Sequence, residues 1–238
     1  MRHYLSATAL VIGMAVAGPV LAATSWTFTG FHTNNSSTYG NTRAYTADGI
    51  QMQATAWANT GSGGTIQNAY LGSDIGVRNR TEGLNVSSPN HSMDNASQYD
   101  SILLSFSEAV ILESLSLHWY STDSDVTVLA YTGAGTPSMG GKTYGGLLAD
   151  GWSLIGHYSD VGYSTRAVNS GDIASSFWLI GAYNPLVGSA GWTTGNDYVK
   201  LASVTGVRKP PTGVPEPGSL ALLGLGVLGL IGARRHKA

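Results

Sequence analysis

Apolar and polar residues alternate in several short stretches between residues 24 and 207, where a helical period is hard to find. In S-W-T-F-T, residues 25–29, Trp26 and Phe28 fall on one face. In I-Q-M-Q-A-T-A, residues 50–56, apolar side chains alternate with Gln and Thr. A period of two is typical of a strand that is buried on one face. Both stretches are therefore predicted to be half-buried strands.

The clearest alternation lies in the middle and the last third of the body. The predicted strands there are S-I-L-L-S-F (101–106), L-S-L-H-W (115–119), D-V-T-V-L-A-Y (125–131), F-W-L-I-G-A-Y (177–183) and Y-V-K-L-A-S-V (198–204). Turn-rich segments such as 59–64 and 132–137 separate strands, and Glu108 and Glu113 flank a turn predicted at A-V-I-L. Short strands spaced by such turns predict an all-β fold, an antiparallel β-sandwich or jelly roll.

The first 22 residues have the features of an export signal. Arg2 precedes the apolar run 7–21, and the small residues Ala22 and Ala23 follow it. This order predicts a secretory signal peptide over residues 1–22, cleaved between Ala22 and Ala23 after export by the Sec machinery. The alternative, an ordinary buried helix, is disfavoured because Pro19 would break it.

The composition changes after Val207, where the predicted body, residues 23–207, ends. Residues 208–217, R-K-P-P-T-G-V-P-E-P, hold four of the eight prolines and predict an extended linker. Residues 218–238 follow, with no charge from Ser219 to Ala233 and a basic tip. Fifteen helical residues cover about 22 Å, which is short of a bilayer core of about 30 Å.

The basic tip makes a membrane-spanning helix plausible despite this length. Arg234, Arg235 and Lys237 can extend its reach and hold that end on the cytoplasmic side. Residues 218–238 are therefore predicted to form a single transmembrane sorting helix. A permanent membrane anchor is the alternative. The G-x-G-x-x-G spacing of residues 224–229 does not indicate a dinucleotide site, because no strand precedes it and no βαβ unit surrounds it.

Pro215, Glu216 and Pro217, followed by a short Leu- and Gly-rich segment and an Arg-Arg cluster, resemble the PEP-CTERM sorting signal. The resemblance implies recognition by exosortase, a membrane-embedded cysteine transpeptidase, near the Pro-Glu-Pro motif. It also implies a transient anchor in the inner membrane of a Gram-negative bacterium, and then delivery to the cell surface or extracellular matrix. The segment H-S-M-D-N, residues 91–95, with D-S-D at 123–125, is similar to exosortase-dependent surface proteins.

Charge and composition exclude several classes of function. Four of the twelve basic residues lie in the terminal signals. Without these four, eight basic residues remain against fourteen acidic ones, so the mature part of the chain is near −6. No cluster of Lys and Arg overrides this charge, and nucleic acid is therefore not an expected partner. The chain has no cysteine, which excludes thiolate catalysis and cysteine metal sites.

Acidic residues at strand entries are candidate ligands for a structural calcium ion, because calcium takes six to eight hard oxygen ligands from loops. The alternative is that they are turn residues that bond the local backbone. The candidate ligands are Asp94, Asn95, Asp100, Asp123 and Asp125.

Two tryptophans are candidates for carbohydrate binding, since an exposed ring stacks on a sugar. They are Trp152 and Trp192, and core packing is the alternative for both. No catalytic constellation is evident: the body lacks a G-x-S-x-G elbow and paired metal-binding histidines. The sequence therefore predicts a non-enzymatic, structural or adhesive surface protein that binds polysaccharide. A secreted polysaccharide hydrolase with the same sorting signal is the alternative.

Overall fold

The computed structural model describes residues 22–28, 33–34, 38–210 and 224. Most of the predicted signal peptide, the Pro215-Glu216-Pro217 motif and the basic tip lie outside these residues. Ala22 and Ala23 are exposed. The chain divides into two units, residues 1–208 and 209–238. In the portion of the chain that the structure covers, no helix is both long enough and apolar enough to span a membrane.

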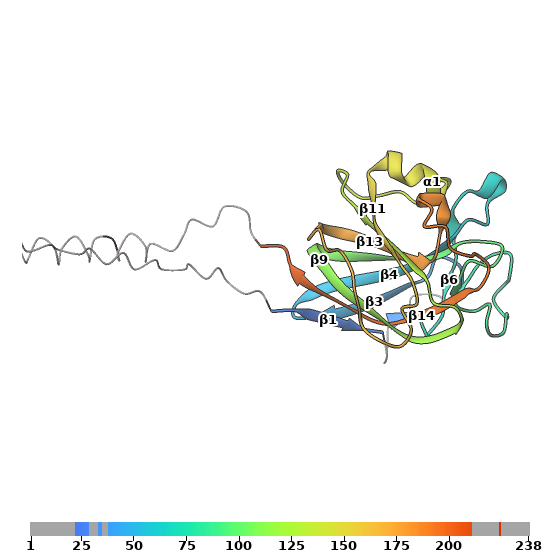
Figure 1. The fold of residues 1–238 in the computed structure, drawn as a ribbon, viewed down its shortest axis with the longest axis horizontal. Helices are drawn as coiled ribbons and strands as arrows, with labels where there is room; N and C mark the ends of the chain where they lie inside the picture. The colour runs from blue at the N-terminus through green and yellow to red at the C-terminus, as the bar shows by residue number, and fades with distance from the viewer. Residues whose placement is uncertain (1–21, 29–32, 35–37, 211–223, 225–238) are drawn as a thin grey trace, which may run out of the picture. The chain divides into compact units, whose positions relative to one another are not determined.

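The first unit is built from antiparallel strands, as predicted (Figure 1). They are β1 (Thr24–Thr27), β2 (Thr33–Asn34), β3 (Thr42–Ala47), β4 (Ile50–Ala58), β5 (Gln67–Asn68), β6 (Tyr70–Leu71), β7 (Val77–Arg78), β8 (Met93–Asp94), β9 (Asp100–Thr122), β10 (Val126–Tyr131), β11 (Trp152–Tyr158), β12 (Arg166–Ala167), β13 (Ala174–Ala182) and β14 (Asp197–Arg208). The helical segments are η1 (Ser62–Gly64), α1 (Tyr144–Leu147), η2 (Leu148–Asp150) and η3 (Pro185–Val187). The predicted all-β antiparallel class is confirmed.

The long strand β9 joins the two halves of the main sheet. The sheet follows the order β11-β10-β13-β9-β4-β3-β2, and β9 also pairs with β12 and β14. The first half of β9 lies between β13 and β4, so that Leu104 is opposite Trp178 on one side and Ala54 on the other. Its second half pairs with β14, whose far edge carries β1. One strand thus belongs to both layers of the body.

The turn predicted between residues 106 and 115 was wrong, because β9 runs through it without interruption. The buried positions alternate as far as Leu112 and then resume at Leu115, one residue out of phase. Along β14, Thr205 is opposite Ser114 and Gly206 is opposite Leu112, so Glu113 has no opposite residue. A β-bulge of this kind adds one residue, bends the strand and changes the face that its side chains share. The break in alternation therefore marks a bulge.

The main core lies between the β1–β14 layer and the β4–β9 layer. The Trp26 ring meets the Phe106 ring edge-on at 4.9 Å, and its Nε1 donates to the Ile50 carbonyl at 3.2 Å. The opposite face of the β9–β13–β10 strands is covered by the segment that holds α1 (Figure 1). There Leu103, Leu129 and Leu179 pack in a second core cluster with Tyr144, Leu147 and Trp152. The central strands are therefore buried on both faces.

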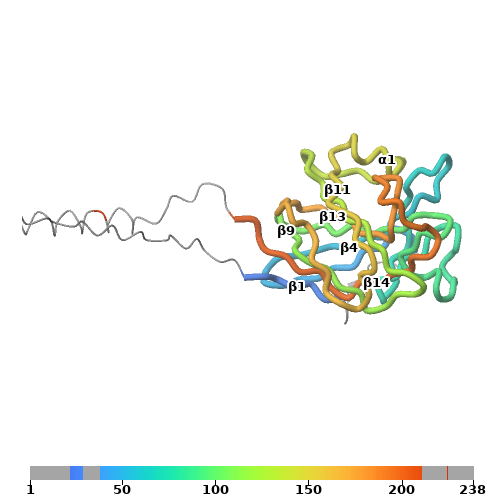
Figure 2. Tube along the Cα trace, in the orientation of Figure 1, coloured from blue at the N-terminus to red at the C-terminus, as the bar shows by residue number. Residues whose placement is uncertain are grey.

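Both ends of the body lie side by side. Thr24 of β1 pairs with Gly206 of β14, and the two strands run antiparallel (Figure 2). Close to this point, Arg208 makes a bidentate ion pair with Glu108 of β9, at 2.8 and 2.9 Å. The chain therefore enters and leaves the body at neighbouring positions.

Truncation of the central strand tests the core. Leu104 is fully buried, and Leu104→Ala is expected to destabilise the protein by about 2–5 kcal/mol through lost burial and a cavity. This corresponds to a fall in melting temperature of roughly 5–15 °C for a domain of this size. Gln53→Ala, on the exposed face of neighbouring β4, is the control and should change stability by less than about 0.5 kcal/mol. Equal melting temperatures for the two variants would contradict the described packing.

Candidate functional site

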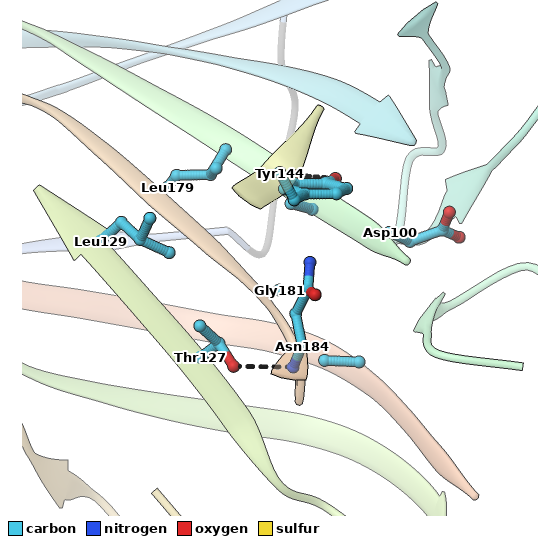
Figure 3. Close-up of a pocket in the computed structure, with 9 residues that line it drawn as sticks. Asp100, Thr127, Leu129, Tyr144, Leu179, Gly181 and Asn184 are labelled. Atoms are coloured by element: carbon cyan, nitrogen blue, oxygen red, sulfur yellow. Dashed lines mark hydrogen bonds between the residues drawn. The ribbon is translucent and has the colours of Figure 1, made fainter. Parts of the chain in front are cut away.

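A small pocket lies beside the start of β9 and is lined by Asp100, Thr127, Tyr144 and Asn184, among others (Figure 3). Its volume is about 10 Å³, which is at the limit for a single water molecule. Tyr144 Oη is 2.7 Å from Ser101 Oγ, and the Asn184 N–H donates to Thr127 Oγ1 at 2.9 Å. This pocket is too small for a substrate, and two pairs of its polar groups bond to each other.

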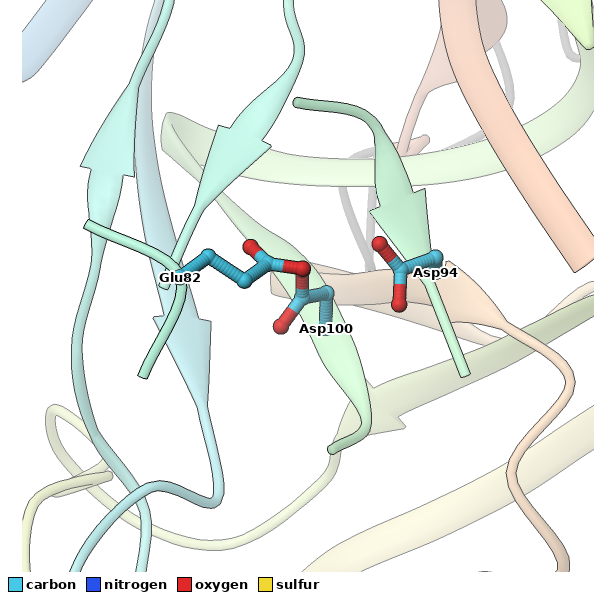
Figure 4. Close-up of side chains that lie close together, drawn as sticks. All are labelled: Glu82, Asp94 and Asp100. Atoms are coloured by element: carbon cyan, nitrogen blue, oxygen red, sulfur yellow. The ribbon is translucent and has the colours of Figure 1, made fainter. Parts of the chain in front are cut away.

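Three carboxylates converge just beyond this pocket and form what we term the first carboxylate cluster: Glu82, Asp94 and Asp100 (Figure 4). One oxygen from each lies within 4.8 Å of the others. The residues come from three segments: the turn after β7, the strand β8 and the first position of β9. Asp94 and Asp100 are 0% and 2% exposed, whereas Glu82 is half-buried.

Asn79 organises one side of this cluster. Its side-chain oxygen accepts from the backbone N–H groups of Thr81 and Glu82, at 3.0 and 3.1 Å. The backbone N–H of Asn79 donates to Glu82 Oε2 at 3.3 Å, and its side-chain Nδ2 donates to Asp100 Oδ1 at 3.2 Å. The buried Asn79 therefore folds the turn and holds two of the carboxylates in place. Asp94 Oδ1 accepts instead from the N–H of Ala96, at 3.0 Å.

The pKa values of all three carboxyl groups are raised. Burial raises the pKa of Glu82 to about 7, and the hydrogen bond from Asn79 opposes it. Burial and the charge of Glu82 raise the pKa of Asp94 to about 8. Burial, and then the charges of Asp94 and Glu82, hold the pKa of Asp100 well above its ordinary value. The charges of neighbouring acids disfavour the charged forms of Asp94 and Asp100, whereas a hydrogen bond with Asp94 lowers the pKa of Glu82 and opposes the effect of its burial.

A second carboxylate cluster consists of Asp123, Asp125 and Asp197, again with one oxygen from each within 4.8 Å of the others. Asp125 and Asp197 are buried and Asp123 is half-buried. Burial raises the pKa of Asp197 to about 7 despite the hydrogen bonds that it accepts. Asp197 is the first residue of β14, and the other two lie in the short segment between β9 and β10.

Hydrogen bonds connect the second cluster to the loops around it. Asp197 accepts from Asn95 Nδ2 at 2.6 Å and from the Asp125 N–H at 2.8 Å. Asp123 accepts from the Ser124 N–H at 2.8 Å and from Asn196 Nδ2 at 3.0 Å. Asp125 Oδ1 accepts from the N–H of Asp160 at 2.8 Å. Each carboxylate of this cluster thus has at least one N–H partner.

The five predicted calcium ligands do not form one site. Asp94 and Asp100 belong to the first cluster and Asp123 and Asp125 to the second, while Asn95 bonds to Asp197. Adjacent residues of an extended chain point to opposite sides, which separates Asp94 from Asn95. Residues two apart share a side, which keeps Asp123 and Asp125 together.

Sequence reasoning missed Glu82 and Asp197. Glu82 lies in a turn that gave no alternating pattern, and its proximity to Asp100 depends on tertiary packing. Asp197 directly precedes the predicted strand 198–204, so its position at a strand entry was the available signal. The same criterion predicts Asp100 and Asp125.

The two candidate tryptophans differ. Trp152 is only 3% exposed and packs in the second core cluster, 5.4 Å from the Tyr131 ring, so its prediction as a carbohydrate platform was wrong. Trp192 is half-buried. Its ring lies 5.2 Å from Tyr183 and 6.1 Å from His157, and we term these three residues the aromatic group. The position of Trp152 at the start of β11 turns its ring inward, whereas Trp192 lies in a loop.

The comparison with protein families identifies the tail. The model of the PEP-CTERM protein-sorting motif matches residues 213–235. The chain therefore carries this motif, as the resemblance indicated, and exosortase is the processing partner that the motif implies. It is an exported protein sorted to the cell envelope. The search of curated proteins found no match.

The raised pKa values predict how stability depends on pH. Between about pH 4 and 8 the folded chain retains protons that the unfolded chain has lost, so without metal the free energy of unfolding falls as pH rises. Burial lowers the pKa of His91 and His157, which acts in the opposite direction near pH 6. We therefore expect the difference in melting temperature, Asp94→Asn minus wild type, to increase from pH 5 to pH 8 in a chelating buffer. Parallel curves for the two proteins would contradict the raised pKa of Asp94.

Proposed function

We propose that this chain is a structural or adhesive protein of the cell surface or extracellular matrix of a Gram-negative bacterium. In this proposal the signal peptide is removed on export, and the tail anchors the chain in the inner membrane until exosortase cleaves near Pro215-Glu216-Pro217. The observation that carries the proposal is the sorting motif at residues 213–235, which follows an all-β body.

We assign polysaccharide binding to the aromatic group. The Trp192 ring packs against Tyr183. Tyr183 holds it in place, because Tyr183 is fully buried and its Oη accepts from the Ala190 N–H at 2.9 Å. The next two residues of the same loop, Thr193 and Thr194, are exposed and carry hydroxyl groups. A rigid, half-exposed indole with adjacent hydrogen-bonding groups fits a sugar ring, whose faces are apolar and whose rim is polar.

A binding role is favoured over hydrolysis by the burial of Asp94 and Asp100 in the first carboxylate cluster. Glycoside hydrolysis uses two carboxyl groups that flank the scissile bond. Asp94 and Asp100 are close together but 0% and 2% exposed, out of reach of a polymer. We therefore propose that the body is not an enzyme. Release of reducing ends from matrix polysaccharide by the purified protein would identify the hydrolase instead.

Replacement of Pro215, Glu216 and Pro217 by alanine tests the sorting step. Intact-mass measurement of the envelope fraction is expected to show the tail retained in this variant and removed in the wild type. The control replaces Pro210 and Pro211 by alanine in the same linker, and its processing should be unchanged. Retention of the tail in the wild type would instead favour a permanent anchor.

Replacement of Trp192 by alanine tests the binding surface. Loss of the ring contact is expected to cost about 1–1.5 kcal/mol, or roughly fivefold to tenfold in Kd for the native exopolysaccharide. Leu148→Ala is the matched control, since Leu148 is also an exposed apolar residue, 42% accessible, but belongs to η2. Both variants should retain the wild-type melting temperature within a few degrees. Equal retention of Trp192→Ala and wild type on the polysaccharide would contradict the assignment.

A further inference from the structure

We propose that the first carboxylate cluster binds one calcium ion, which joins the turn after β7, the strand β8 and the start of β9. The ligands that the structure assigns are Glu82, Asp94 and Asp100. The inference concerns the stability of the exported body and does not depend on whether the aromatic group binds polysaccharide.

The separation of the oxygens fits a shared cation. One oxygen from each of the three carboxylates lies within 4.8 Å of the others. Calcium binds oxygen at about 2.3–2.6 Å, so two ligands on opposite sides of the ion are about 5 Å apart. Figure 4 shows the three side chains approaching one another from three different segments. A single ion placed between them would reach all three.

Unpaired buried oxygens indicate that the cluster needs a ligand. Asp94 Oδ2 and Asp100 Oδ2 are buried and have no hydrogen-bond partner, although their residues are 0% and 2% exposed. The other oxygen of each is held by a donor, Ala96 N–H for Asp94 and Asn79 Nδ2 for Asp100. A buried polar atom without a partner is costly. Donors that fix one oxygen and leave the second free are typical of oriented metal ligands.

The second carboxylate cluster lacks this feature. Each of its carboxylates accepts N–H donors, and none of its carboxylate oxygens is among the buried, unpaired atoms of the described residues. Its hydrogen bonds already join β14 to the entry of β10. We therefore assign the ion to the first cluster alone.

Among the residues that the structure describes, no basic side chain forms an ion pair with the first cluster. Lys200 is buried, but its ammonium group pairs with Asp74 and lies 3.0 Å from His91 Nε2. The other ion pairs within the described ranges join His91 to Asp74, Lys142 to Asp150 and Arg208 to Glu108. Two buried acids and a half-buried one that lie together without a paired cation are expected to stay protonated or to bind a metal.

The donor set selects calcium among the common divalent ions. All three ligands are carboxylates, and the cluster contains no imidazole or thiolate, which zinc prefers. Magnesium demands octahedral geometry, keeps several waters and usually takes one or two carboxylates. Calcium accepts three carboxylates with irregular geometry. Extracellular calcium modules bind with Kd values of about 0.1–1 mM, which suits an exported protein.

Calcium titration of the chelator-treated, purified protein tests the proposal. Addition of CaCl2 to several millimolar is expected to raise the melting temperature of the wild type by several degrees, and MgCl2 by less. Glu82→Gln should weaken the Kd for Ca²⁺, measured by isothermal titration calorimetry, by at least about tenfold. Asp94→Asn should melt at or above the metal-free wild type, because it removes a buried repulsion, and should show no response to calcium.

Asp123→Asn in the second cluster is the matched control and should respond to calcium as the wild type does. A wild type with no response would overturn the proposal, as would full responses in both Glu82→Gln and Asp94→Asn. Loss of the response in Asp123→Asn alone would place the ion in the second cluster and overturn the assignment made here. Because Asp94→Asn is expected to fold at least as stably as the wild type, unfolding cannot account for its loss of response.

Discussion

The hydrogen bonding of β9 on both edges is the constraint on which the rest of the body depends. β13 and β4 bond to its first half, and β14 bonds to its second half. Since one strand serves both layers, its bend at Glu113 sets how the β1–β14 layer crosses the β4–β9 layer. The positions of Trp26 and Phe106, which meet across the core, follow from that bend. Neither layer is independent of the other, because they share a backbone.

The same strand explains why acids are buried at one end of the body. β9 begins at Asp100, opposite Ala58 of β4, so its first side chain lies among packed segments. The pairing of β8 with β14 brings Asp94 beside it, and the Asn79 turn supplies Glu82. Charge burial is costly unless it is compensated. Asn79 and the Ala96 N–H hold one oxygen each of Asp100 and Asp94, but the second oxygens have no partner, and a bound cation would compensate them.

Sequence periodicity predicted much of the fold, and local spacing predicted less of the site. Residues 50–56 alternate as expected, with Ile50 and Met52 buried and Gln51 and Gln53 exposed. The bulge at Glu113 looked like a turn because one extra residue breaks the alternation just as a chain reversal does. The acids at strand entries were recognisable from the sequence, but not their division between two clusters. That division depends on which side of a segment each residue faces, and on the contribution of Glu82 from a turn without a periodic pattern.

If the protein is held at a surface, as proposed, the covalent continuity of β14 has a mechanical consequence. Trp192 lies a few residues before β14, and the linker begins where β14 ends, at Arg208. Tension between a polymer held at Trp192 and an attachment beyond the linker would run along one extended backbone. Peptide bonds, which are far stronger than the hydrogen bonds of a sheet, would bear that load. The other strands of the body would then not carry the tension. The body could remain folded under a force that would unfold a domain in which the tension crosses the hydrogen bonds of the sheet.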